Sequence, residues 1–129
     1  MTLTTYSVED ILRAVGWTVE ITEDFERWWD RLTEDERISI DGMIRVLEAQ
    51  GPSLGQPYTV DTAGSLVAQL RVPHGDRTLC VLYVPEHSRT AVVLLLGTTT
   101  GTYDEICPPD EIEAANRIYQ KYLTARNRH

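Results

Sequence analysis

The hydrophobic pattern is strongest between residues 66 and 97, where three short apolar runs are separated by polar clusters. The runs read LVAQLRV, RTLCVLYV and TAVVLLLG, and the breaks PHGD and PEHSR contain residues typical of tight turns. This pattern predicts three consecutive antiparallel strands joined by hairpins. The first run alternates, so one face is expected to be buried. That face comprises Leu66, Ala68, Leu70 and Val72. The other two runs are apolar on both faces, which predicts central strands covered on each side.

Helical spacing of apolar residues occurs on both sides of this strand region. The four predicted helices begin at side chains that are expected to cap their first turns, namely Ser7, Thr22, Thr33 and Asp110. The first helix covers residues 7–15, and a half-buried strand over residues 17–21 follows it. Gly51 and Pro52 are expected to end the third helix, because Gly accepts a left-handed conformation and Pro cannot continue a helix. Residues 52–65 show little periodicity and are predicted to form a loop.

The predicted order of elements is helix, strand, helix, helix, three strands, helix. This order indicates one α+β domain over residues 1–129, in which residues 1–16 form an N-terminal helical extension. The second and third helices are joined by a short connection and are expected to form an antiparallel hairpin. Aromatic and aliphatic side chains give the last three helices their buried faces. They are Phe25, Trp28, Trp29 and Leu32, then Ile40, Met43, Ile44 and Leu47, then Ile112, Ala115, Ile118, Tyr119 and Tyr122.

Charge is distributed unevenly along the chain. The formal net charge is −8, and the whole acidic surplus lies in residues 1–65. An acidic total argues against a general nucleic-acid-binding protein, although Arg71, Arg77 and Arg89 crowd the predicted hairpins. No apolar run approaches the length of a membrane span, and no secretion signal is recognisable at the N-terminus, so a cytoplasmic protein is expected. The two cysteines lack metal-binding spacing, and neither a metal nor a cofactor is predicted.

Several segments taken together resemble the phage-type HigB branch of the RelE superfamily. They are WTVEIT, FxxWWxxL, GPSLGQPY, QLRV, VLYV, VLLLG and DEIEAANRIYQKYL, in that order from residue 17 to residue 123. The resemblance implies a small twisted antiparallel sheet packed against a helical hairpin, with a closing helix at the C-terminal end. The predicted helix over residues 7–15 is an extension beyond this shared core. It also implies a toxin of a type II toxin–antitoxin pair, which cuts mRNA on the translating ribosome without metal. The implied partner is an antitoxin, often a helix-turn-helix protein.

The resemblance also identifies which positions match the family motifs and which depart from them. Arg71 matches the arginine of the family's ELR strand, with Gln69 where glutamate is common. Cys80 stands where the family's YRVLY strand usually has arginine. Residues 98–101 (TTTG) replace a GDKTG loop, so its lysine is also absent. Two cationic residues that the family is expected to use in catalysis are therefore absent from this sequence.

Metal-independent RNA cleavage needs a base for the 2′-hydroxyl, an acid for the leaving oxygen and cations at the phosphate. The residues that we predict to supply these roles are Arg71, His74, Arg77 and Tyr103. Arg89 and Lys121 are predicted to bind substrate. Three of these predictions have an alternative: His74 as an exposed turn residue, Tyr103 as a packing residue, and Arg71 as an ion-pair partner of the acidic helices.

Three functions remain open at this point. The first is a toxin that acts as an endoribonuclease on mRNA. The second is a toxin-like interaction protein that binds an antitoxin-like partner without cleaving RNA, which Cys80, the TTTG loop and the acidic charge favour. The third is an unrelated acidic α+β binding module.

Overall fold

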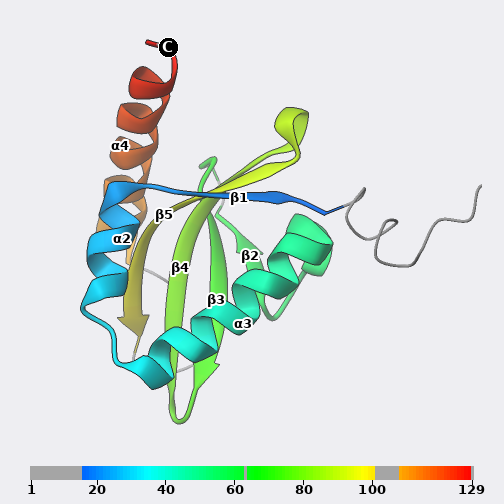
Figure 1. The fold of residues 1–129 in the computed structure, drawn as a ribbon, viewed down its shortest axis with the longest axis vertical. Coiled ribbons are helices and arrows are strands. Elements are labelled where there is room, and N and C mark those ends of the chain that lie inside the picture. The colour runs from blue at the N-terminus through cyan, green and yellow to red at the C-terminus, as the bar shows by residue number, and fades with distance from the viewer. Residues whose placement is uncertain (1–15, 63, 101–107, 129) are drawn as a thin grey trace, which may run out of the picture.

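A five-stranded sheet with helices on both faces forms the centre of the computed structural model (Figure 1). The structure describes residues 16–62, 64–100 and 108–128, so the predicted helix over residues 7–15 lies outside it. The strands are β1 (Thr18–Ile21), β2 (Thr59–Asp61), β3 (Ala68–His74), β4 (Arg77–Glu86) and β5 (Ala91–Thr100). The helices are α2 (Glu23–Asp30), α3 (Glu34–Gln50) and α4 (Pro109–Arg126).

The three strands predicted from residues 66–97 are confirmed as consecutive antiparallel strands, β3, β4 and β5. The sheet order is β1-β5-β4-β3-β2. The predicted α+β fold is also confirmed. The sheet is mixed, however, because β1 pairs with β5 in parallel, with Thr18 opposite Ala91. The chain between these two strands passes through α2, α3 and three other strands, and a parallel pair requires such a long connection.

The predicted loop over residues 52–65 contains two short elements that sequence periodicity did not indicate. Residues Gly51–Leu54 form a 3-10 turn, and β2 adds to the edge of the sheet beside β3. A three-residue strand is too short to show alternation. It forms because β3 offers hydrogen-bonding groups along its outer edge, with Thr59 opposite Leu70.

The sheet has an apolar core on each face, as the doubly apolar runs predicted. Under α2 and α3 lie Phe25, Ile40, Leu47, Ala68, Leu70, Val72, Leu79, Val81, Tyr83, Val92 and Leu94. Under α4 lie Val67, Cys80, Leu82, Val84, Val93, Leu95, Ala115 and Tyr119. Leu66 was predicted to be buried but is 64% exposed, because β3 begins two residues later and imposes no alternation on it.

The helix ends follow the predicted capping chemistry except at α4. The Thr33 hydroxyl accepts a hydrogen bond from the backbone N–H of Glu36, whose carboxylate accepts one from Thr33, which is a complete capping box. Gly51 follows α3 with a φ of 65°. Helix α4 begins at Pro109, one residue before the predicted cap Asp110. In Figure 1, α2 and α3 cover the same face and diverge from the turn that joins them.

Candidate functional site

Arg71 lies near the middle of β3, on the sheet face that carries α4. Its neighbours Leu70 and Val72 belong to the core under α2 and α3, and side chains alternate along a strand. Its register partner Cys80 belongs to the core under α4. The backbone N–H of Arg71 donates to the carbonyl of Tyr58 over 2.7 Å, which ties this part of β3 to the chain before β2. The half-buried Arg71 is therefore separated from the acidic helices α2 and α3 by the sheet.

His74 and Arg77 lie together at the tip of the β3–β4 hairpin, on the opposite face from Arg71. They are register partners, and both contact α3. The Nδ1 atom of His74 is 2.9 Å from the Ser39 hydroxyl. The guanidinium of Arg77 lies 3.4 Å from the Glu36 carboxylate. Hydrogen bonds from the Thr33 backbone and side chain, with the nearby charges of Arg77 and His74, lower the pKa of Glu36 against the opposing effect of burial.

The residues predicted for catalysis are therefore divided between two faces of the sheet. The structure brings His74 and Arg77 together and places Arg71 on the other face. Tyr103 lies outside the described residues. The structure therefore does not place Arg71 and His74 around one phosphate. The sequence did not separate them, because residues 73–76 were predicted to form a turn, where strand alternation no longer fixes the face of a side chain.

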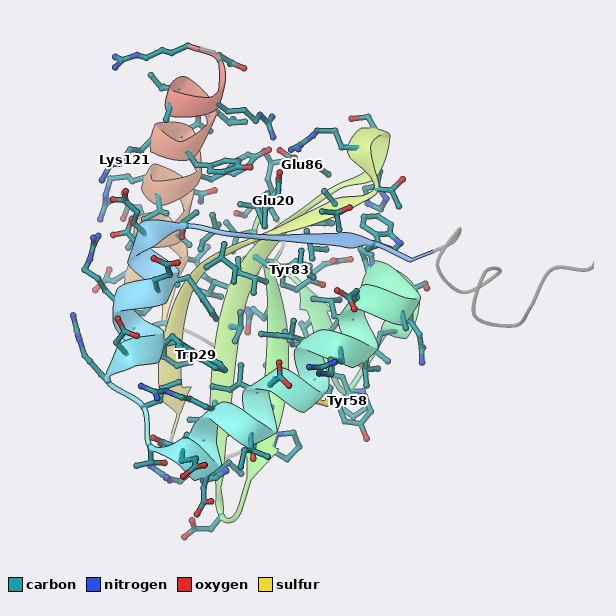
Figure 2. The ribbon with its side chains drawn as sticks, in the orientation of Figure 1. Glu20, Trp29, Tyr58, Tyr83, Glu86 and Lys121 are labelled. Atoms are coloured by element: carbon teal, nitrogen blue, oxygen red, sulfur yellow. The ribbon has the colours of Figure 1, made fainter. Side chains whose placement is uncertain are left out.

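Arg89 lies at the other end of β4 from Arg77 and is held by two carboxylates. Its guanidinium donates to both oxygens of Glu20, over 2.7 and 3.0 Å, and also to Glu86. Arg126 from α4 donates to the two oxygens of Glu86 over 2.8 and 3.1 Å. Figure 2 shows Glu20 and Glu86 close together between β1 and α4. In this geometry Arg89 pairs with the buried Glu86 and the partly exposed Glu20, contacts that sequence reasoning missed.

Two tyrosines of α4 complete this cluster, which we call the carboxylate cluster (Glu20, Glu86, Arg89, Tyr119, Tyr122 and Arg126). Tyr119 donates to Glu86, and Tyr122 donates to Glu20 over 2.6 Å. Burial and the Glu86 carboxylate raise the pKa of Tyr119 to about 12. The hydrogen bond from Arg89 lowers the pKa of Glu20. The cluster joins three segments that lie far apart in the sequence, Glu20, residues 86–89 and residues 119–126, so no local spacing could have indicated it.

Lys121 lies on α4 (Figure 2), whereas Arg71 and His74 lie on β3. Lys121 lines a cleft of about 250 Å³ between the start of α2 and α4, together with Ile21, Ile118 and Tyr122. A second cleft of about 440 Å³ opens between α2, α3 and β1. Among the described residues, the predicted substrate-binding residues Arg89 and Lys121 therefore do not share a site with Arg71, His74 or Arg77.

Neither cleft carries a recognisable metal centre. Across residues 16–62, 64–100 and 108–128, no group of three or more His, Cys, Asp or Glu side chains is arranged to hold a metal ion. In the same residues, none of the helices combines the length and the apolar character needed to cross a membrane.

The architecture defines a small protein of the RelE fold. A solved structure of a mutant of the Escherichia coli toxin RelE in the free state matches with a TM-score of 0.54 and 8% identity, over 82% of this chain and 97% of that one. The family model of the phage-derived protein Gp49-like (DUF891) matches residues 27–120, and the chain belongs to that family.

Two relatives from Mycobacterium tuberculosis extend the likeness. The proposed toxin HigB2 is 29% identical over 118 residues, which is 85% of this chain and 56% of HigB2. The proposed toxin HigB3 is 33% identical over 81 residues, which is 60% of this chain and 69% of HigB3. This chain thus spans little more than half the length of HigB2. The predicted resemblance to the HigB branch of the RelE superfamily is confirmed.

Proposed function

We propose that this protein is the toxin of a type II toxin–antitoxin pair, which arrests growth by cutting mRNA on the ribosome. Its site of action is then the cytoplasm, and its partner is a neutralising antitoxin, for which a helix-turn-helix protein is the expected type. The RelE fold and the likeness to HigB2 and HigB3 support this proposal. Its strongest structural support is the position of Arg71 on the sheet face turned away from the acidic helices.

The charge distribution explains why this position matters. Helices α2 and α3 carry nine carboxylates against three arginines, and a phosphate backbone would be repelled by them. The sheet separates Arg71 from that surface. On the face of Arg71, helix α4 carries equal numbers of acidic and basic side chains. Within the described part of the chain, this face is therefore less negative than the face of α2 and α3, which favours the approach of RNA to Arg71.

His74 and Arg77 have a supporting role in this proposal. Their contacts with Ser39 and Glu36 hold the hairpin tip against α3. We propose that they position the strand that carries Arg71 rather than acting on the same phosphate. Tyr103 remains a proposed acid or base, and Lys121 a proposed contact for more distant RNA.

The test is induced expression of the wild-type chain with and without the product of the neighbouring gene. We expect growth arrest and cleaved transcripts with the wild type, and the loss of both with Arg71→Ala. Because Arg71 also has structural contacts, Arg71→Lys provides a second variant that keeps the charge. Arg45→Ala removes an exposed arginine from α3 and is the matched control. Arrest that persists in a folded Arg71→Ala protein would refute the assignment of Arg71.

A toxin-like interaction protein without nuclease activity is the second candidate. The division of Arg71, His74 and Arg77 between two faces of the sheet favours it. This candidate predicts that the wild type forms a complex with the neighbouring gene's product while leaving growth and transcripts unchanged. The same expression experiment therefore distinguishes the two candidates.

A further inference from the structure

The edge of the sheet at β1 lies between the two clefts. Ile21 belongs to both of them and is 51% exposed. On the side of α3, the apolar lining of the larger cleft is formed by Val19, Ile21, Phe25, Trp29, Ile44 and Leu94. On the side of α4, the smaller cleft adds Ile118, Tyr122 and Ala125. An apolar surface therefore extends from α3 to α4 across an exposed strand.

The backbone of β1 leaves hydrogen-bonding groups on its outer edge. The N–H groups of Thr18 and Thr22 donate to the carbonyls of Thr90 and Leu94, on the side of β5. Alternation along the strand turns the N–H groups of Val19 and Ile21 the other way. No strand lies beyond β1 in the described part of the chain. An added segment could therefore pair with this edge and place alternate side chains in the two clefts.

The rim of this surface is acidic. Glu26, Asp30 and Asp41 line the larger cleft, and Glu23 and Asp24 line the smaller one, where Lys121 is the basic residue. Asp41 is paired with Arg45 on the same helix, and Asp24 with Arg27. In the described residues, no ion pair involves Glu26 or Asp30. These two carboxylates are available to a basic partner.

We propose that the β1 edge and its two clefts bind an extended segment of a partner protein in which apolar side chains alternate with basic ones. The partner is the neutralising protein of the proposed pair, so the identity of the partner rests on the proposed function. Because alternate side chains of a strand face opposite ways, the apolar ones would enter the smaller cleft. The basic ones would lay their stems over the apolar lining of the larger cleft and meet Glu26 and Asp30 with their charges. The position of this surface is separate from Arg71.

Charge argues against two other occupants. A second copy of this chain would bring the same acidic rim against itself, and like charges at an interface oppose association. Residues 1–15 of the chain contain Glu9, Asp10 and Arg13, so this segment supplies one positive charge against two negative ones. A basic segment of another protein complements the rim better than either.

The test uses a short peptide of alternating valine and lysine, with a valine–glutamate peptide as its counterpart. We expect the lysine peptide to shift the backbone amide NMR signals of Val19 and Ile21 in the full chain and to slow their hydrogen exchange. The double variant Glu26→Lys/Asp30→Lys should weaken binding by about tenfold or more. Asp76→Lys/Glu113→Lys changes the net charge equally at exposed positions away from the clefts and should keep the affinity within about twofold.

Three results would overturn the proposal. They are equal binding of the glutamate peptide, signal shifts confined to other surfaces, and binding that appears only after removal of residues 1–15. The peptide assay does not depend on toxicity, so a chain that fails to arrest growth would refute the proposed function without affecting this result. Co-purification of the double variant with the neighbouring gene's product at wild-type yield would show that the partner binds elsewhere.

Discussion

At the scale of single residues, Gly97 in β5 is packed so closely that no other residue fits. A Cβ atom at this position would lie 2.2 Å from the Cε3 atom of Trp28, whose ring also contacts Phe25 in the core. The indole would have to leave its packed position. We therefore expect Gly97→Ala to lower the free energy of unfolding by about 1–3 kcal/mol, measured by urea denaturation.

Gly42 in α3 is the matched control, because a Cβ atom there would have no neighbour within 4 Å. It is exposed in the middle of a helix, where alanine is favoured over glycine. Gly42→Ala should raise the free energy of unfolding by about 0.5–1 kcal/mol. If both variants changed stability in the same direction, the close packing of Trp28 against β5 would not be the cause.

Residue chemistry that acts locally could be predicted from the sequence. The capping box at Thr33 and Glu36 depends on residues three apart, and the end of α3 at Gly51 depends on one dihedral angle. The contact of His74 with Ser39 could not be predicted, because it depends on the register of β3 and on where α3 crosses the sheet. The contact between the Ser39 hydroxyl and the His74 imidazole is therefore set by the tertiary fold and not by the local sequence pattern.

At the scale of elements, the carboxylate cluster attaches α4 to the rest of the fold. Glu86 is 8% exposed and accepts hydrogen bonds from Arg89, Tyr119 and Arg126. Glu86→Gln keeps the shape but removes the charge that these donors surround. We expect the free energy of unfolding at neutral pH to fall by about 1–3 kcal/mol, measured by urea denaturation.

The carboxylate cluster also makes the stability difference between wild type and Glu86→Gln depend on pH. Burial opposes ionisation of Glu86, but hydrogen bonds from Arg126, Tyr119 and Arg89 outweigh it and lower the pKa below the usual value of 4.5. The stabilisation is therefore complete above about pH 4.5 and is lost as the pH falls through the lower folded-state pKa. The stability gap between wild type and Glu86→Gln should narrow in acid.

Glu113→Gln is the control for this experiment. Glu113 is exposed on α4 and lies 3.9 Å from Arg117, so its loss should change stability by less than about 0.5 kcal/mol at any pH. A gap between wild type and Glu86→Gln that stays constant from neutral pH to pH 3 would contradict the role of the charged form.

The sequence largely predicted which segments form helices and strands, but it did not predict how all the strands pair in the sheet. The alternation in β3 and the doubly apolar runs of β4 and β5 indicated the central sheet and its two covered faces. The parallel pairing of β1 and the addition of β2 depend on chain crossings and on an exposed strand edge. Neither feature leaves a periodic signal in the sequence, because hydrophobic alternation records burial and not the direction of the neighbouring strand.

At the scale of the whole molecule, the sheet divides two kinds of surface. Helices α2 and α3 hold most of the acidic surplus on one face, and Arg71 lies on the other. The sequence indicated the acidic helices and the arginine-rich hairpins separately. It did not indicate that the sheet stands between those helices and Arg71, while Arg77 pairs with Glu36 on α3. Under the proposed function, this separation would allow an acidic chain to present Arg71 to a polyanion.

Because the sheet separates Arg71 from the acidic helices, we predict that substitutions can separate growth arrest from neutralisation by the partner. Glu26→Lys/Asp30→Lys changes the proposed partner surface and leaves the face of Arg71 intact. Cells that express it should still arrest, and co-expression of the neighbouring gene should no longer rescue them. Arg71→Ala should give the reverse, a protein that binds its partner and leaves growth unaffected. Colony counts and co-purification of each variant measure the two properties independently.

The two variants also control each other, because each must retain the property that the other loses. If Glu26→Lys/Asp30→Lys removed both arrest and partner binding, the simplest cause would be misfolding, which circular dichroism and urea denaturation would detect. If that variant were folded and still lost arrest, the acidic face would take part in the toxic activity. RNA and partner would then act on one surface, and the separation by the sheet would have no functional role.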